Sequence, residues 1–120
     1  MQSNERPYWN MEIEPILNTS RMREIQLEKL KTALVWQYDN TPFNRRRFDQ
    51  AGVRPEDIRS FADFAEAIPA TGQEKIREAI AEIGFDMDKL MRHLFGDKRM
   101  QDLYLLTTTS GTTGIPTPYP

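Results

Sequence analysis

The 120-residue chain contains no cysteine and only one histidine, His93. Without thiols, disulfide scaffolds, cysteine-based zinc sites and thiol nucleophiles are all excluded. His93 has no second imidazole or cysteine to accompany it, so we expect an exposed or partly packed helical residue rather than a metal ligand. The absence of cysteine also fits a reducing cytoplasm.

The chain also lacks a strong charge of one sign and a long apolar run. Sixteen basic and eighteen acidic side chains leave a net charge of −2, so nucleic acid is not expected as a partner. The longest apolar stretches, Ala33–Trp36 and Leu103–Leu106, are far too short to cross a bilayer. The polar N-terminus has no signal-peptide core. These observations predict a cytoplasmic protein with no membrane partner.

Apolar residues spaced three or four apart predict helices near residues 20–39, 72–83 and 87–95. The last of these carries the apolar stripe Met87–Phe95, which we interpret as core, with a partner-docking helix as the alternative. Asn18–Ser20 offers caps for the long helix, because the side-chain oxygens can accept hydrogen bonds from the amides of the first turn.

Proline, glycine and polar capping residues predict where the other helices begin and end. Pro42 can occupy the first position of a short helix, and Gly52 can close it in the left-handed conformation. Side chains able to bond first-turn amides also precede the later helices: Ser60, Asp86 and the capping-box pair Thr71 and Glu74.

Two charged groups could suggest chemistry but have simpler interpretations. Arg45–Arg47 could contact a phosphate or coenzyme A, but a solvated helix face is the better interpretation of an isolated basic run. Glu12 and Glu14 alternate as the surface residues of a strand-like segment would, so a general acid/base pair is not expected.

The pattern changes near the end of the chain. Leu103–Leu106 is a short apolar run typical of a buried strand, and such a strand needs pairing partners that the earlier helices do not offer. It leads into Thr107–Gly114, which has six hydroxyl side chains. Gly111 and Gly114 allow a ligand to approach closely, and the amides and hydroxyls of such a loop can hold phosphate oxygens. By composition alone, a flexible linker is the better interpretation.

A longer pattern favours the phosphate loop. Ser110–Pro116 matches the Ser-Gly-Thr-Thr-Gly-x-Pro signature of adenylate-forming enzymes, and no Walker A lysine is present. Thr117 stands where most of that superfamily has lysine, which resembles the phenylacetate–CoA ligase branch. The resemblance covers about Tyr8–Arg77 and Leu103–Pro118, and Gly84–Asp102 matches less well. Upstream segments similar to that branch in kind and order are Tyr8-Trp9, Gln26–Leu30, Pro42–Phe48, Pro55–Ile58 and Ile68–Thr71.

The resemblance implies a mainly α N-terminal segment that leads into the first strand and phosphate loop of an α/β adenylate-forming enzyme, an incomplete fold. Residues 1–120 would then be the N-terminal part of the large AMP-binding domain, ending just after the phosphate-binding loop 107–117. The expected ATP phosphate contacts are Thr109, Ser110, Gly111, Thr112, Thr113, Gly114 and Thr117.

The same resemblance implies a reaction in which ATP with Mg²⁺, a small aryl or arylacetic acid and coenzyme A give an acyl-CoA, AMP and pyrophosphate. It allows a homodimer. No catalytic or metal-binding residue is expected in this segment, because the residues that bind adenine, the acyl group and magnesium lie downstream in the family. The segment alone should therefore be inactive. The alternatives are a small helical interaction module with a disordered Thr/Pro-rich tail, or an adenylyltransferase of the same branch with another acceptor.

Overall fold

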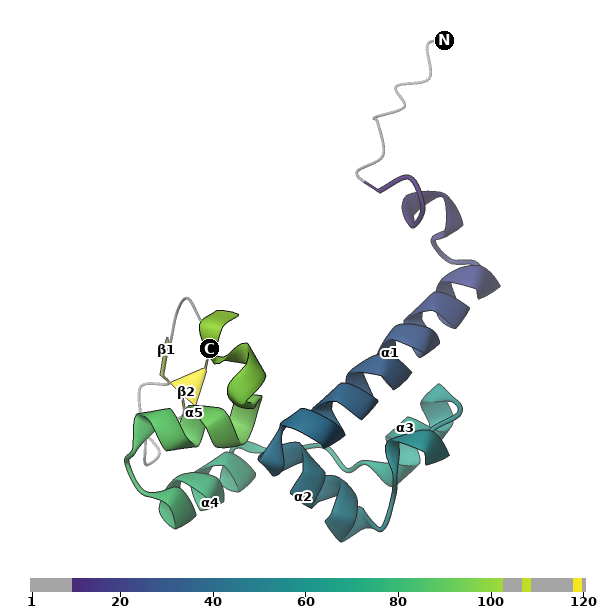
Figure 1. The fold of residues 1–120 in the computed structure, drawn as a ribbon. Helices are drawn as coiled ribbons and strands as arrows, with labels where there is room; N and C mark the ends of the chain where they lie inside the picture. Colours follow the sequence, from purple (N-terminus) through teal and green to yellow (C-terminus); the bar gives the residue numbers. More distant parts are fainter. Residues whose placement is uncertain (1–9, 103–106, 109–117, 120) are drawn as a thin grey trace.

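A computed structural model of the chain describes residues 10–102, 107–108 and 118–119. These residues form helices joined by short turns, followed by one pair of very short strands (Figure 1). In chain order the elements are the 3-10 helix η1 (Glu14–Ile16), α1 (Ser20–Asn40), α2 (Pro42–Ala51), the 3-10 helix η2 (Pro55–Asp57), α3 (Phe61–Ala67), α4 (Gln73–Ile83), α5 (Met87–Phe95), the 3-10 helix η3 (Asp97–Asp102), β1 (Thr107–Thr108) and β2 (Pro118–Tyr119).

The three helices predicted from periodicity are confirmed, and so are most of their boundaries. The Thr19 side chain caps α1 by accepting a hydrogen bond from the Met22 amide at 3.4 Å. The helix stops before Pro42 because a residue that precedes proline avoids the helical conformation, and Thr41 is extended. Pro42 begins α2, and Gly52 closes it with a φ of 68°.

The later caps are confirmed with one exception. Ser60 Oγ accepts from the Asp63 amide at 3.1 Å, and Asp86 Oδ1 accepts from the Lys89 amide at 3.1 Å. The capping box of Thr71 and Glu74 is wrong, because α4 begins one residue later than that pattern requires. Gly72 is the N-cap and makes no side-chain hydrogen bond, so Glu74 stands at the second helical position instead of the third.

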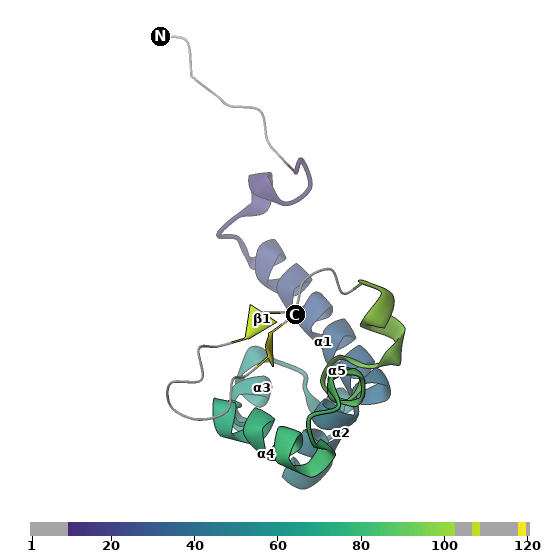
Figure 2. The ribbon, with the colours of Figure 1, turned by 90° about the vertical axis from the view of Figure 1, so that its left-hand side faces the viewer.

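Two hydrophobic clusters hold the helices together, and α2 takes part in both. Leu34 of α1, Phe48 of α2 and Ile58 after η2 form the first cluster. The second lies between α4 and α5, and Phe43 of α2 packs against it. Figure 2, turned from the view of Figure 1, shows α4 and α5 nearer the viewer and α1 and α2 behind them. The buried members of the second cluster are Ala79, Ile80, Leu90, Met91 and Leu94.

The interpretation of the Met87–Phe95 stripe as core is therefore confirmed for its three buried positions. Met87, at the start of the stripe, is 42% exposed. The predicted extended run Leu103–Leu106 lies outside the described residues. None of the described helices is long and apolar enough to cross a membrane.

A polar corner joins the end of α1 to the start of α2. Thr41 is only 1% exposed, and its hydroxyl donates to the Gln37 carbonyl oxygen at 2.6 Å. Asn44 Nδ2 donates in turn to Thr41 Oγ1 at 3.0 Å. The corner therefore satisfies its buried polar groups while the chain reverses direction.

We predict that alanine substitutions at the starts of α4 and α5 have different effects on the free energy of unfolding. Asp86→Ala should lower the free energy of unfolding by about 1 kcal/mol, because it removes an N-cap hydrogen bond. Thr71→Ala, one residue before the N-cap of α4, should change it by less than about 0.5 kcal/mol, since the Thr71 side chain caps nothing. Urea unfolding of the two variants measures both values. Equal losses would contradict the assignment of Gly72 as the cap.

Candidate functional site

The described strands bracket the predicted phosphate loop. β1 pairs with β2 in antiparallel fashion, with Thr107 opposite Tyr119 and Thr108 opposite Pro118. The pairing brings the two ends of the loop segment side by side. It also places Pro118 and Tyr119, which the interaction-module alternative assigns to a disordered tail, in a paired strand. The predicted phosphate contacts Thr109, Ser110, Gly111, Thr112, Thr113, Gly114 and Thr117 lie outside the described residues.

The segment that leads toward the loop, η3, is held against two helices. Arg92 of α5 donates to Asp97 Oδ1 at 3.1 Å, and Met100 packs against the α4–α5 cluster. On the other side, the Arg99 guanidinium lies 5.5 Å from the centre of the Trp36 ring on α1. The helices α1 and α5 therefore fix the chain shortly before β1 begins.

A groove with an apolar floor and a rim of both charges runs between α1 and η3. Trp36 and Phe95 contribute aromatic surface, and the charged lining residues are Glu28, Lys29 and Arg99. The remaining lining residues are Thr32, Ala33 and Gln37. The groove has no histidine or cysteine, and its charges nearly balance, so it offers no built site for a triphosphate.

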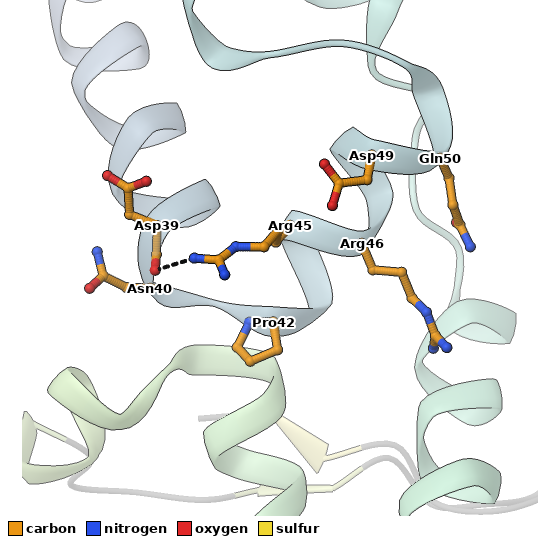
Figure 3. A pocket seen from close by; sticks show the side chains of 7 residues that line it. All are labelled: Asp39, Asn40, Pro42, Arg45, Arg46, Asp49 and Gln50. Carbon is orange, nitrogen blue, oxygen red and sulfur yellow. Dashed lines mark hydrogen bonds between the residues drawn. The ribbon is translucent and has the colours of Figure 1, made fainter.

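The pocket in Figure 3 tests the interpretation of the basic run. Seven residues line it: Asp39, Asn40, Pro42, Arg45, Arg46, Asp49 and Gln50. Arg45 reaches back to α1, where Nε donates to the Tyr38 carbonyl oxygen at 2.9 Å and Nη2 to that of Asp39 at 2.7 Å. Arg46 points in another direction (Figure 3). The two guanidinium groups therefore do not converge on one anion.

The interpretation of Arg45–Arg47 as a solvated helix face is confirmed for Arg45 and Arg46, which are exposed, but it misses the contacts that these side chains make with other segments. Arg46 Nη1 donates to Glu82 Oε2 of α4 at 2.6 Å, and this hydrogen bond holds the pKa of Glu82 below its usual value. Arg47, which is half-buried, donates to the Pro69 carbonyl oxygen at 2.6 Å, and burial lowers its pKa. Each arginine fastens α2 to a different neighbour, which periodicity alone cannot reveal.

The prediction of a strand-like segment around Glu12 and Glu14 is wrong. Asn10 Oδ1 accepts from the amides of Glu12 at 2.9 Å and Ile13 at 3.1 Å, which turns the chain. Glu14 then begins η1, where Pro15 supplies a helical φ.

His93 is the partly packed helical residue that the sequence predicted. Its ring meets that of Phe43 edge to face, with 5.9 Å between the centres. Nε2 is buried and has no hydrogen-bond partner among the described residues. Burial lowers the pKa of His93, the charge of Arg46 adds to this, and Glu82 acts in the opposite direction. Within the described ranges no cluster of three or more acidic or histidine side chains could hold a metal ion.

The comparisons with known proteins point to one family, although no family model matches the chain. Phenylacetate–coenzyme A ligase of Escherichia coli K12 is 32% identical over 110 residues, 90% of this chain and 22% of that protein. The enzyme of the same name from Aromatoleum evansii is 34% identical over 88% of this chain and 22% of its own length. The chain belongs to the phenylacetate–CoA ligase family. It spans about a fifth of the length of these relatives.

Solved structures confirm the fold. A 2-hydroxyisobutyryl-CoA ligase in complex with 2-HIB-AMP and CoA superposes with a TM-score of 0.68 and 24% identity, covering 97% of this chain and 24% of that one. An open conformation of the same ligase gives a TM-score of 0.67 at 22% identity. The predicted mainly helical part of an adenylate-forming CoA ligase is therefore confirmed as the fold class.

Three residues where α1 meets the end of α5 and η3 were not recognised as a unit from the sequence: Trp36, Gly96 and Arg99. Trp36 reads as a packing aromatic, and Arg99 as one of many surface charges. Gly96 directly follows the apolar stripe of α5, a position that favours positive φ, and its φ is 81°. No local signal indicates what these residues contact.

We predict that His93 makes stability depend on pH in a narrow window. Because its pKa is lowered by folding, the unfolded chain binds the proton more tightly. The contribution is fully present above the ordinary value of about 6.5 and is lost as pH falls through that value, levelling off below the folded pKa. Urea unfolding between about pH 7.5 and 5.5 should show this loss, because most carboxylates titrate lower. His93→Gln should flatten the profile; an unchanged slope would contradict the assignment.

Proposed function

We propose that the chain is the N-terminal part of an ATP-dependent carboxylate–CoA ligase, lying within its AMP-binding domain and including its phosphate-binding loop. The identity of 32–34% to phenylacetate–CoA ligases across about nine-tenths of the chain is the observation that carries the proposal. The Ser110–Pro116 signature adds to it, because it stands between two strands that bring its ends together.

The proposed reaction has two steps. A carboxylate oxygen attacks the α-phosphorus of ATP, the bond to the bridging oxygen of the β-phosphate breaks, and pyrophosphate leaves with that electron pair. The thiolate of coenzyme A then attacks the acyl carbon of the acyl-adenylate and displaces AMP. Mg²⁺ is expected to accompany ATP, held by residues outside this chain.

In this proposal the loop acts through donors and not through charge. Thr107–Gly114 contains no lysine or arginine, so amides and hydroxyls would orient the β- and γ-phosphates and stabilise the charge that develops on pyrophosphate. The amides of Gly111 and Gly114 and the hydroxyls of Ser110, Thr112 and Thr113 are the proposed contacts, with Thr109 and Thr117 beside them.

We propose an aryl or arylacetic acid as the substrate, because the relatives above 30% identity are named phenylacetate–CoA ligases. Pyrophosphate exchange by the full-length protein, driven by phenylacetate or by 2-hydroxyisobutyrate, tests this. Formation of an acyl-CoA from the same mixture separates a ligase from an adenylyltransferase with another acceptor. Absence of exchange with every carboxylate would overturn the proposed function.

Glycine substitutions in the loop provide a sharper test. Gly111→Val or Gly114→Val in the full-length protein should lower pyrophosphate exchange on the order of a hundredfold, since a β-branched side chain blocks close approach to phosphate. Thr112→Ala should have a smaller effect, because neighbouring donors remain. Melting temperatures serve as the control for folding. Exchange unchanged in the glycine variants would rule out the phosphate-binding role.

The isolated 120 residues should not bind ATP·Mg²⁺ tightly. The proposal gives this chain one wall of the nucleotide site, and electrostatic stabilisation needs donors on several sides of the phosphates. Titration calorimetry should therefore show no saturable heat below about 1 mM ligand, since a few exposed donors bind weakly. A clear one-site isotherm would mean that these residues contain their own nucleotide pocket.

A further inference from the structure

We propose that the C-terminal turns of α1 position the phosphate loop, and that Gly96 and Arg99 are the positioning residues through which they do so. The inference rests on the proposed function, because it assigns the loop its role in adenylation. It goes further by giving the helical part of the chain a task in that reaction.

The first contact is a close approach of two backbones. Gly96 ends α5 with a φ of 81° and is buried against the last residue of α1. A Cβ placed on Gly96 would overlap the Asn40 carbonyl oxygen and would lie 3.1 Å from the Asn40 carbonyl carbon. Only glycine allows the chain to leave α5 at this point, and the end of α1 is the surface that it meets.

The second contact lies one turn further along. Arg99 of η3 places its guanidinium 5.5 Å from the centre of the Trp36 ring, and it also pairs with Asp102 Oδ2 at 3.3 Å. Trp36 and Asn40 are four residues apart on α1, so both contacts fall on the same side of that helix. Together they hold both η3 and the turn before it.

The connection from η3 to the loop is short. Five residue steps separate Asp102 from Thr107, which span at most about 18 Å when fully extended. The position of η3 therefore limits how far away β1 can lie. The pair of β1 and β2 in turn sets the positions of the two ends of the loop. Because a misplacement of about 1 Å at a reacting group can cost on the order of a hundredfold in rate, small shifts of η3 should be measurable as lost adenylation.

Gly96→Ala in the full-length protein tests the first contact, and Gly84→Ala is its matched control. Gly84 also ends a helix with positive φ, 83°, but a Cβ there would meet nothing within 4 Å. Both variants place an alanine at a similar positive φ, and only Gly96→Ala brings its Cβ against α1. We expect Gly96→Ala to lower kcat/KM for ATP in pyrophosphate exchange about tenfold or more relative to Gly84→Ala.

Arg99→Gln tests the second contact without adding an atom near α1, in case Gly96→Ala fails to fold. Lys98→Gln removes the same charge from the neighbouring residue of η3 and is the control. Arg99→Gln should lower kcat/KM for ATP severalfold, and Arg99→Lys should restore part of it, because an ammonium group can still lie over the Trp36 ring. The KM for the carboxylic acid should stay unchanged, since the proposed loop contacts only phosphates.

The outcomes separate the two proposals. A wild-type protein with no exchange would overturn the proposed function and this inference with it. An active wild type in which Gly96→Ala matches Gly84→Ala, or in which Arg99→Gln matches Lys98→Gln, would overturn the inference alone. Equal changes in the KM values for ATP and acid would also overturn it, because they would indicate a general structural defect.

Discussion

A helix that must stop at a proline leaves its last carbonyl groups without helical partners, and in α1 those groups become attachment points for the rest of the described chain. The Gln37 carbonyl accepts from the Thr41 amide and hydroxyl, and those of Tyr38 and Asp39 accept from Arg45. The Asn40 carbonyl meets Gly96. The end of the helix before Pro42 is therefore joined to α2 by hydrogen bonds and approached closely by the residue that ends α5.

The three consecutive arginines extend this arrangement from the corner to the other elements. Successive residues on a helix point about 100° apart, so Arg45, Arg46 and Arg47 reach α1, α4 and the segment before α4 respectively. The exposed pair of Arg46 and Glu82 contributes little stability. The hydrogen bonds of Arg45 and Arg47 to backbone carbonyl oxygens have a charged donor and join α2 to α1 and to the segment before α4. The basic run Arg45–Arg47, which could suggest anion binding in the sequence, thus joins α2 to its neighbours.

The sequence predicted the structural features that depend on interactions between neighbouring residues. It missed the contacts between residues that are distant in the chain. Thr19, Pro42, Gly52 and Asp86 act within a few residues of themselves, so the helix boundaries followed from local chemistry. The capping box at Thr71 failed because α4 begins one residue later, with Gly72 as its N-cap. The approach of Gly96 to Asn40 joins residues far apart in the chain, and no periodicity encodes it. The phosphate loop stays a prediction: its residue types match a signature, but Thr109–Thr117 lie outside the described residues.

In the proposed reaction, a loop without charged side chains would depend on helices that do not themselves contact the phosphates. A lysine can stabilise a phosphate over several ångströms, whereas an amide or hydroxyl must lie within about 3 Å of the oxygen it serves. A loop that works by hydrogen bonds therefore depends on accurate placement more than a charged loop does. A pair of two-residue strands is too short to supply that accuracy alone. The backbone contact at Gly96 and the ring contact of Arg99 lie close to the loop in the chain, so we infer that the helical segment contributes to the proposed adenylation by holding the loop in position.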